Sequence, residues 1–358
     1  MTSRPLRIVI AGWTGAGNVG DELLFDRVAR SLRRLGAEPI AMSVDSSATS
    51  RLHAVETIDA LSLPQVVQGL RAADGMVFGP GGLLQDTTSP FSLPGHLGRV
   101  VLAQRLGLSV IGFGLGAVPL VRRGSSRLVR QILRRSGPIV VRDRQSESVL
   151  RSAGVTRTIR SPDLAFSLFH DLQVDRGVEI EGHPDIALVP RLSRAGDTSG
   201  WWIETARMLI GSDGTVRLIG LDPRDGALLG TIRRALGSCS RIVAVDHHNI
   251  AQEIGACRGV ISARYHGVIA AVLGGRPVVA VGFKPDITAL VGQIGAGADL
   301  VSHDRSGLGA SAAALEELMK RGVTTAEARD RLGAATVIGD RVLAAWLARI
   351  RTPIATGR

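Results

Sequence analysis

Short apolar segments alternate with longer amphipathic segments along most of the chain, and this alternation constrains the fold more than any other feature. In the first half the pattern predicts strands at 6–11, 39–44, 75–79, 109–113 and 139–142, and helices at 21–35, 64–72, 95–106, 125–135 and 145–153. Strands that alternate with helices are typical of a parallel sheet covered by helices on both faces. The first half therefore predicts a doubly wound α/β domain.

The alternation pauses at residues 169–185, where Asp, Glu, Gly, His and Pro concentrate, and then resumes. The second half predicts strands at 186–189, 216–221, 242–245, 259–262 and 278–282, and helices at 200–210, 226–236, 250–258 and 265–273. We expect two Rossmann-like domains, residues 1–172 and 173–358, with a ligand cleft between the carboxyl ends of their sheets. The length of 358 residues agrees, because a single core usually stops growing at about 250–300 residues.

A glycine-rich loop, residues 12–20, follows the first predicted strand and leads into a helix that opens with Asp21 and Glu22. Glycines let the backbone approach a ligand closely, and the start of a helix offers unpaired N–H groups and the positive end of its dipole. The loop therefore predicts a site for a phosphorylated or polyhydroxy ligand. A loop whose glycines serve only the turn and the helix packing remains an alternative.

The same loop matches the dinucleotide-binding pattern GxGxxG at Gly15, Gly17 and Gly20, and Asp45 closes the second predicted strand. Two features argue against a nicotinamide or flavin site. The first glycine of that pattern normally turns the chain directly after the strand, whereas two other residues intervene here. The acidic pair after the loop would also place negative charge beside the pyrophosphate. A dinucleotide-dependent oxidoreductase is therefore a lesser alternative.

The positive charge of the chain is almost entirely arginine: the formal net charge is +11, and the lysines are Lys284 and Lys320. Guanidinium groups suit bidentate contacts with carboxylates and phosphates, although codon usage in a GC-rich genome gives the same bias. We expect an acidic partner, either an anionic substrate or a membrane surface. We do not expect nucleic acid, because aromatic residues make up only 3% of the chain and the arginines form no tail or known module.

No secretory signal or membrane-spanning segment is evident, so we expect a cytoplasmic protein. Cys239 and Cys257 are too few for a disulfide framework or a metal cage, which agrees with a reducing compartment. Residues 246–249 contain adjacent histidines, but Asn249 is a good cap for the following helix, so we expect no metal there. If these histidines act, we expect His248 to contact a donor substrate from a loop that borders the cleft.

Polar residues follow several predicted strands. Residues 79–86 form a second glycine-rich turn that ends in Gln85 and Asp86, whose side chains can hydrogen-bond the hydroxyls of a sugar. A tight turn with capping side chains is the alternative. In the second half, Arg191 follows the strand at 186–189, and the segment 264–266 opens the helix that follows the strand at 259–262.

Arg264 and His266 therefore lie at a helix N-terminus, where a cation is normally unfavourable. A bound anion would offset that cost. Two arginines and a histidine that face one cleft can hold a carboxylate and a phosphate together, and the histidine can transfer a proton near neutral pH. Structural ion pairs for Arg191 and Arg264, and a local capping role for His266, remain alternatives.

The predicted helix at 125–135 is basic and amphipathic, because Arg127, Arg130 and Arg134 share one face and the apolar residues gather elsewhere. Such a helix can dock on anionic lipid. A solvated basic face is the alternative.

Five segments, in order, resemble motifs of the polysaccharide pyruvyl transferases: residues 12–22, 79–86, 141–146, 162–166 and 264–266. The resemblance runs from residue 7 to about residue 286. It implies two Rossmann-like domains in the manner of B-type glycosyltransferases (GT-B). It also implies transfer of the enolpyruvyl group of phosphoenolpyruvate to a sugar of a cell-surface glycan, usually as a ketal. The sequence departs at Tyr265, where leucine is usual, and at Pro80, where glycine is usual.

The resemblance and the loop positions together predict two sets of site residues. The donor set, for phosphoenolpyruvate as co-substrate, is Arg191, Arg264, His266, Gly267 and His248. The acceptor set, for a saccharide that such enzymes often use in lipid-linked form, is Gly17, Asn18, Asp21, Glu22, Gly81, Gly82, Gln85 and Asp86. No other cofactor and no metal ion is expected.

The expected chemistry assigns a role to each charged group. His266 supplies a proton, Arg191 and Arg264 hold the carboxylate and phosphate, and Asp21 or Asp86 accepts hydroxyl protons. The main alternative is a GT-B glycosyltransferase whose nucleotide-sugar diphosphate would bind the two arginines and the helix N-terminus. A binding protein that has lost catalysis also remains open.

Overall fold

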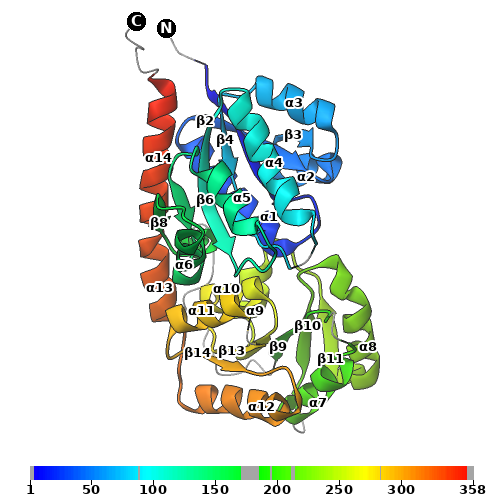
Figure 1. Cartoon of the computed structure of the whole chain (residues 1–358). Coiled ribbons are helices and arrows are strands. Elements are labelled where there is room, and N and C mark those ends of the chain that lie inside the picture. Colours follow the sequence, from blue (N-terminus) through cyan, green and yellow to red (C-terminus); the bar gives the residue numbers. More distant parts are fainter. Residues whose placement is uncertain are drawn as a thin grey trace, which may run out of the picture. The chain divides into compact units, whose positions relative to one another are not determined.

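The computed structural model describes residues 4–87, 89–170, 185–193, 196–210, 214–282 and 284–352 (Figure 1). The chain divides into two compact units. Unit 1 comprises Met1–Gly17, Asp21–Ala165 and Ala335–Arg358, and unit 2 comprises Asn18–Gly20 and Phe166–Ala334. The boundary expected at residues 172 and 173 lies outside the described residues. Residues 335–358 were expected in the second domain, but they belong to unit 1.

Unit 1 is built on a parallel sheet. Its strands are β1 (Leu6–Thr14), β2 (Ala37–Ser43), β3 (Glu56–Asp59), β4 (Gly75–Phe78), β5 (Gly81–Leu84), β6 (Ser109–Ala117), β7 (Ile139–Val141) and β8 (Thr158–Arg160). The order is β3-β2-β1-β4-β6-β7-β8, and β5 pairs with β6. The inner strands β1, β4 and β6 are buried apolar runs, as expected for strands covered on both faces.

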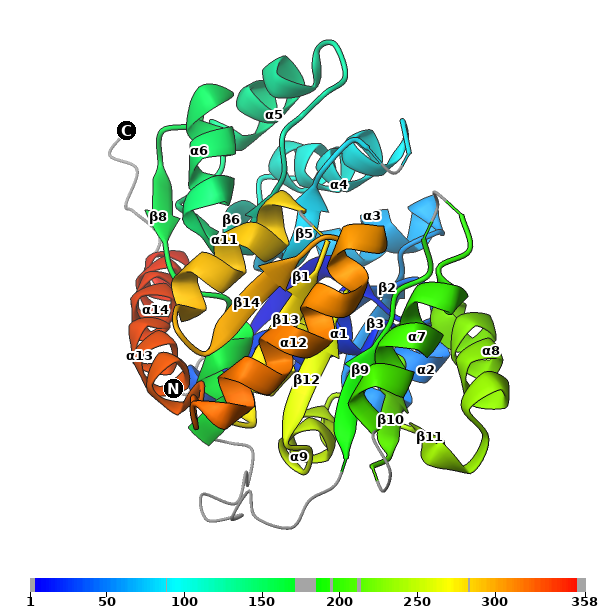
Figure 2. The ribbon, with the colours of Figure 1, turned by 90° about the horizontal axis from the view of Figure 1, so that it is seen from below.

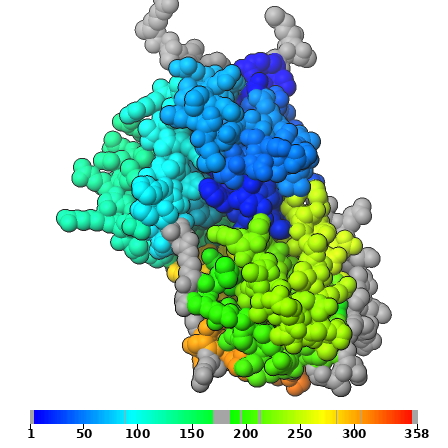
Figure 3. All heavy atoms as spheres, turned by 90° about the vertical axis from the view of Figure 1, so that its right-hand side faces the viewer, coloured from blue at the N-terminus to red at the C-terminus, as the bar shows by residue number. Residues whose placement is uncertain are grey.

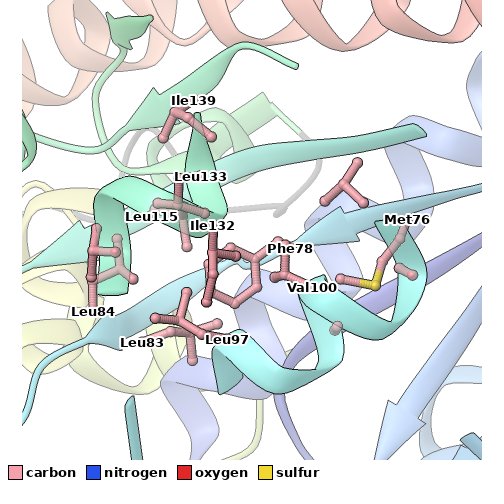
Figure 4. Close-up of a cluster of buried hydrophobic side chains, with 14 of the residues drawn as sticks. Met76, Phe78, Leu83, Leu84, Leu97, Val100, Leu115, Ile132, Leu133 and Ile139 are labelled. Atoms are coloured by element: carbon pink, nitrogen blue, oxygen red, sulfur yellow. The ribbon is translucent and has the colours of Figure 1, made fainter. Parts of the chain in front are cut away.

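The helices of unit 1 are α1 (Val19–Arg34), α2 (Ser46–His53), α3 (Leu63–Arg71), α4 (Ser92–Arg105), α5 (Ser125–Leu133), α6 (Arg144–Ser152) and α14 (Val337–Arg351), and the short η1 (Leu164–His170) follows β8. Apolar residues of α3, α4, α5 and α6 pack on the sheet in one buried cluster. Figure 4 shows Leu97, Ile132 and Leu133 of this cluster against Phe78 and Leu115 of the strands.

Helix α14 belongs to unit 1 because its contacts are with the first sheet. It packs on β6 and β8, and Trp346 Nε1 donates to Ser109 Oγ at 2.9 Å. Asp340 accepts from the buried Arg27 of α1 at 2.7 Å. A chain that was expected to end in the second domain therefore returns to the first.

Unit 2 repeats the architecture. Its strands are β9 (Ile186–Val189), β10 (Val216–Ile219), β11 (Ser240–Val243), β12 (Gly259–Ser262), β13 (Val278–Val281) and β14 (Ala298–Val301). The helices are α7 (Ser199–Ile210), α8 (Gly226–Leu236), α9 (Ile250–Gly255), α10 (Tyr265–Leu273), α11 (Pro285–Ile294), α12 (Arg305–Lys320) and α13 (Ala326–Ala335), with η2 (Pro223–Asp225) and η3 (Gly237–Cys239). Helices α7 and α12 pack together over the sheet (Figure 2).

Both sheets have the strand order of a Rossmann fold. Unit 2 has the parallel order β11-β10-β9-β12-β13-β14, which is 3-2-1-4-5-6 in its own chain order, and unit 1 begins in the same way. In such sheets the ligand site lies at the switch point, where the strand order reverses. That point lies between the carboxyl ends of β1 and β4 in unit 1, and of β9 and β12 in unit 2. The predicted fold class of two doubly wound parallel α/β domains is confirmed.

The second glycine-rich segment differs from its predicted structure. The segment predicted as a second glycine-rich turn is partly a strand, because Gly81–Leu84 forms β5 and Gly81 pairs with Leu115 of β6. Separately, within the part of the chain that the structure describes, no helix combines the length and apolarity that crossing a bilayer requires.

Candidate functional site

Three basic residues follow three adjacent strands of unit 2. Val189, Ser262 and Ala280 lie in register across β9, β12 and β13. Arg191 and Arg264 each follow this row by two positions, and Lys284 begins the turn into α11. The carboxyl edge of the sheet therefore carries two guanidinium groups and one ammonium group near its switch point, where a ligand is expected.

Arg264 occupies the predicted position at the start of α10, but its guanidinium is already in an ion pair. It is the N-cap residue of α10 and makes no side-chain capping bond. Its Nη2 lies 2.6 Å from both carboxylate oxygens of Asp225, and its Nε lies 3.0 Å from Oδ2. Its Nη1 is 3.5 Å from Asp222. The structural ion pair that the sequence left open is thus present, and Arg264 is held in one position.

Burial and neighbouring cations lower the pKa values of Arg191 and Lys284. Burial lowers the pKa of Arg191, and the neighbouring Arg264 lowers it further. Loss of hydration lowers the pKa of Lys284 to about 8, with Arg191 as the next cause, although part of its side chain is exposed. Asp286 opposes the shift of both groups. A bound anion would relieve this repulsion, so the cluster is suited to a phosphate or carboxylate.

His266 is the second residue of α10 and lies against the segment 18–20, which belongs to unit 2 by its contacts. A Cβ at Gly20 would collide with the His266 ring. The ring also makes an edge contact with Tyr265, with centroids 5.3 Å apart. Gly20 is therefore required for the close approach of an imidazole, which is a different role from the turn of a dinucleotide-binding loop.

Asn18 is fixed by the same part of unit 2. Its Oδ1 accepts from the Gly20 N–H at 3.0 Å, and its Nδ2 lies 3.5 Å from Asp222 Oδ2. The Val19 N–H donates to the Leu221 carbonyl at 2.9 Å. Asn18, predicted to contact the acceptor, thus lies beside the loop that carries Asp222.

Gly267 and His248, the other residues predicted to bind the donor substrate, contact neighbouring residues of unit 2. Gly267 packs tightly, because a Cβ there would meet Val189 and the Ser262 hydroxyl. His248 is exposed after the edge strand β11, where its N–H donates to Asp246 at 2.8 Å. Its ring lies 3.8 Å from that of the buried His247. Asn249 has the expected N-cap position of α9, but its side chain accepts from the Asp246 N–H and does not cap the helix.

Two carboxylates that were predicted to bind the acceptor accept hydrogen bonds from backbone N–H groups of unit 1. Glu22 is buried, with Oε1 accepting from the Gly15 N–H at 2.8 Å and Oε2 lying 2.9 Å from His53 Nε2. Asp86 is also buried and accepts from the N–H groups of Val121 at 3.0 Å and Arg122 at 2.8 Å. Burial opposes ionisation of Asp86, but these hydrogen bonds outweigh it and lower its pKa. Both carboxylates stabilise loops.

Asp21 is the better placed carboxylate for contact with a ligand. It is only half-buried, and its Oδ1 lies 3.3 Å from the position that a Cβ on Gly81 would occupy. Gly81 and Gly17 have φ values of +113° and +71°, which favour glycine. Gln85 is half-buried and its Oε1 accepts from Thr87 at 3.2 Å. Gly82, the last member of the predicted set, is exposed on β5.

Sequence reasoning missed Asp222, Asp225 and Lys284. Asp225 ends η2, which follows β10, Asp222 is the N-cap residue of η2, and both are buried. One signal was present for Lys284, since it is one of two lysines in a chain rich in arginine and follows a predicted strand. No local pattern distinguishes the two aspartates from an ordinary acidic turn.

Helix α5 shows the predicted basic face. Arg127, Arg130 and Arg134 are exposed, while Val129 and Ile132 are buried in the core of unit 1. The apolar side of the helix is therefore used for folding, and α5 offers charge without apolar side chains that could enter a bilayer.

Solved structures with similar folds include glycosyltransferases and UDP-GlcNAc 2-epimerases. HepE of Anabaena, in complex with UDP and glucose, is 14% identical, with 96% of this chain and 99% of that chain covered and a TM-score of 0.63. A glycosyltransferase from Rickettsia africae is 12% identical, with coverages of 98% and 100% and a TM-score of 0.64. The UDP-GlcNAc 2-epimerase of Methanocaldococcus jannaschii, in complex with UDP-GlcNAc and UDP, is 11% identical, with coverages of 96% and 100% and a TM-score of 0.63. Such identities show a GT-B-like fold alone.

No curated protein matches the sequence significantly. A family model described as polysaccharide pyruvyl transferase matches residues 18–285, which include the segment from Asn18 to Gly20, the carboxylates of η2 and Arg264 to His266. The match covers well over half of the chain. The chain therefore belongs to the polysaccharide pyruvyl transferase family of enzymes.

Proposed function

We propose that the enzyme transfers the pyruvyl group of phosphoenolpyruvate to hydroxyls of a saccharide and releases phosphate. The observation that carries this proposal is the pair of Arg191 and Lys284 at the carboxyl edge of unit 2, beside the ion-paired Arg264, because two neighbouring cations favour a small ligand with two acidic groups. Family membership supports a saccharide as the acceptor.

The reaction can be divided among the chain's own residues. His266 donates a proton to the methylene carbon of phosphoenolpyruvate, which creates a cationic centre at C2. A saccharide hydroxyl attacks C2 and loses its proton to Asp21. The C2–O bond to phosphate then breaks, and a second hydroxyl attacks C2 to close the ketal, with its proton passing to the released phosphate. Arg191 and Lys284 hold the carboxylate and the leaving phosphate, and Arg264 keeps the loop after β12 in place through Asp225.

Transfer of a glycosyl group from a nucleotide sugar, with release of the nucleotide, is a second candidate because similar folds occur with bound UDP. In that case the same cationic group would bind a diphosphate. Thermal unfolding of the enzyme with phosphoenolpyruvate, UDP, a UDP-sugar or NAD distinguishes the candidates, since a ligand of the native state raises the melting temperature by mass action. Stabilisation by UDP and not by phosphoenolpyruvate would support the second candidate and overturn the first.

We also propose that the acceptor is lipid-linked and that the enzyme works at the cytoplasmic face of a membrane. The exposed Arg127 and Arg130 of α5 and its C-cap residue Arg134 support this, because a basic surface attracts anionic lipids. Binding to anionic vesicles that persists after all three are changed to glutamine would discard this role for α5.

A further inference from the structure

The four most exposed large apolar side chains among the described residues lie in unit 1, in or beside the segments that connect its strands to the next helices. They are Leu61 (76% exposed), Leu63 (68%), Phe91 (80%) and Val121 (69%). Leu61 and Leu63 follow β3, Phe91 follows β5 and Val121 follows β6. These strands run parallel in one sheet, so their carboxyl ends lie at the same edge, although β2, β1 and β4 separate β3 from β6. We name these four residues the apolar edge.

The apolar edge continues into grooves beside α3. One groove of about 490 Å³ lies between α3 and α4 and is lined by Leu61, Leu63, Gly95, Arg99 and Arg105 among others. A second, of about 520 Å³, lies on the other side of Leu63 and includes Val67 and Arg71. A Cβ at Gly95 or at Gly98 would contact no other heavy atom, so α4 leaves the first groove open. In Figure 3 the blue atoms of α3 and the cyan atoms of α4 share one exposed face of unit 1.

The charge around the apolar edge is positive. Between residues 61 and 135 the basic residues that carry a permanent charge are Arg71, Arg99, Arg105, Arg122, Arg123, Arg127, Arg130, Arg134 and Arg135. The acidic residues of the same stretch are Asp74 and Asp86. Asp74 pairs with Arg4 at 2.7 Å, and Asp86 is buried beneath the N–H groups of Val121 and Arg122. The nearby Asp59 accepts from the Leu61 N–H.

We propose that the apolar edge inserts into the interfacial region of a bilayer that contains anionic phospholipid, while Arg99, Arg105, Arg122 and Arg123 contact lipid phosphates. Exposed leucine and phenylalanine next to arginines that outnumber the nearby carboxylates is the chemistry of a surface that lies on an anionic membrane. The proposal rests on the part of the proposed function that brings the enzyme to a membrane. It differs from docking by α5, whose apolar residues are buried.

The test is co-sedimentation of the full-length enzyme with vesicles of phosphatidylcholine alone or with phosphatidylglycerol added. We expect binding to the anionic vesicles, weakened by salt. The triple variant Leu61→Ser, Leu63→Ser, Phe91→Ser should bind them about tenfold or more weakly. The matched control Leu52→Ser, Met208→Ser, Ile242→Ser changes three exposed apolar residues elsewhere and should bind like the wild type. Equal binding by the triple variant would overturn the proposal.

Two further measurements keep the outcomes separate. Melting temperatures show whether the triple variant is folded, and its stabilisation by phosphoenolpyruvate reports on the donor site of unit 2 without any lipid. A variant that no longer binds vesicles but is still stabilised by phosphoenolpyruvate supports the membrane contact. If phosphoenolpyruvate does not stabilise the wild type, only the proposed function is refuted. The wild type could instead fail to bind anionic vesicles and form a dimer, while the triple variant stays monomeric. In that case the apolar edge joins two copies of the chain and the membrane proposal is wrong.

Discussion

Asp225 and Arg264 join two loops of unit 2 at the point where its strand order reverses. Both carboxylate oxygens of Asp225 lie 2.6 Å from Arg264 Nη2, and Oδ1 also accepts from the Leu192 N–H at 2.9 Å. One buried carboxylate thus fixes the chain after β9, next to Arg191, and the chain after β12, next to His266. The ion pair therefore positions two of the groups that we propose for catalysis.

Changing Asp225→Asn should destabilise the enzyme by about 3–5 kcal/mol, because it removes the nearer of the two carboxylates that pair with a mostly buried guanidinium. Chemical denaturation followed by circular dichroism measures the effect. The control is Asp330→Asn, which removes the exposed partner of Arg329 and should cost about 0–1 kcal/mol. Equal losses in the two variants would show that the buried pair does not stabilise the fold.

Changing Arg191→Gln should weaken binding of phosphoenolpyruvate about 10- to 100-fold, because a charge-assisted contact with the ligand contributes about 1.5–3 kcal/mol. The stabilisation by phosphoenolpyruvate, followed as a function of concentration, gives the affinity. Arg207→Gln, an exposed arginine on α7, is the matched control and should keep the wild-type affinity. A normal affinity in Arg191→Gln would remove this residue from the donor site.

Changing His266→Ala should lower turnover about 100-fold or more while the affinity for phosphoenolpyruvate changes little, because the lost function is proton transfer. Phosphate release with a saccharide acceptor measures turnover. His248→Ala should stay close to the wild type, since His248 lies after the edge strand β11. Gly20→Ala should also reduce turnover, because the added Cβ displaces the imidazole. Rapid phosphate release by His266→Ala would assign the proton to another group.

The lowered pKa of Lys284, about 8, predicts a pH dependence. In the unfolded chain lysine titrates at about 10.4, so between these values the unfolded state binds more protons and stability should rise with pH. The penalty for the charged ammonium is fully present below pH about 8. Lys284→Met should therefore stabilise the free enzyme at pH 7 and remove this rise, as thermal melts across pH 7–10 would reveal.

Lys284 should also make the affinity for phosphoenolpyruvate depend on pH, but in the opposite direction to stability. Affinity for phosphoenolpyruvate should fall as the pH rises through about 8, because Lys284 loses its charge. Lys284→Arg should shift this fall to a higher pH. An affinity that is flat from pH 7 to 9.5 in the wild type would exclude Lys284 from contact with the anion.

Asp21→Asn and Asp86→Asn should have different effects. Asp21 is half-buried beside Gly81, so its variant should fold normally and lose turnover about 100-fold, as expected for a general base. Asp86 accepts two backbone N–H groups, so its variant should lose about 1–3 kcal/mol of stability. Melting temperature and turnover, measured on both, separate the roles. Loss of turnover in Asp86→Asn without loss of stability would reverse this assignment.

The sequence by itself determined the fold class, the two domains and the family. Strand and helix periodicity is a local property, so segments such as 186–189, 226–236 and 265–273 were predicted with the bounds that the structure has. The positions of Arg191 and His266 also followed from the sequence, because a residue that comes directly after a parallel strand lies at the carboxyl edge of the sheet. These inferences need no knowledge of which strands are neighbours.

Only the tertiary structure decided which charged residues are partners and which are accessible. Asp222 and Asp225 lie about forty residues from Arg264 in the chain and meet it because β10, β9 and β12 are neighbours in the sheet. Glu22 and Asp86, predicted to contact the acceptor, are buried, and each has a partner more than thirty residues away, His53 for Glu22 and the Val121 N–H for Asp86. Helix α14 returns to unit 1 because Trp346 and Asp340 find partners there. Burial and pairing of charge depend on contacts between segments distant in the chain, and a local sequence pattern does not encode them.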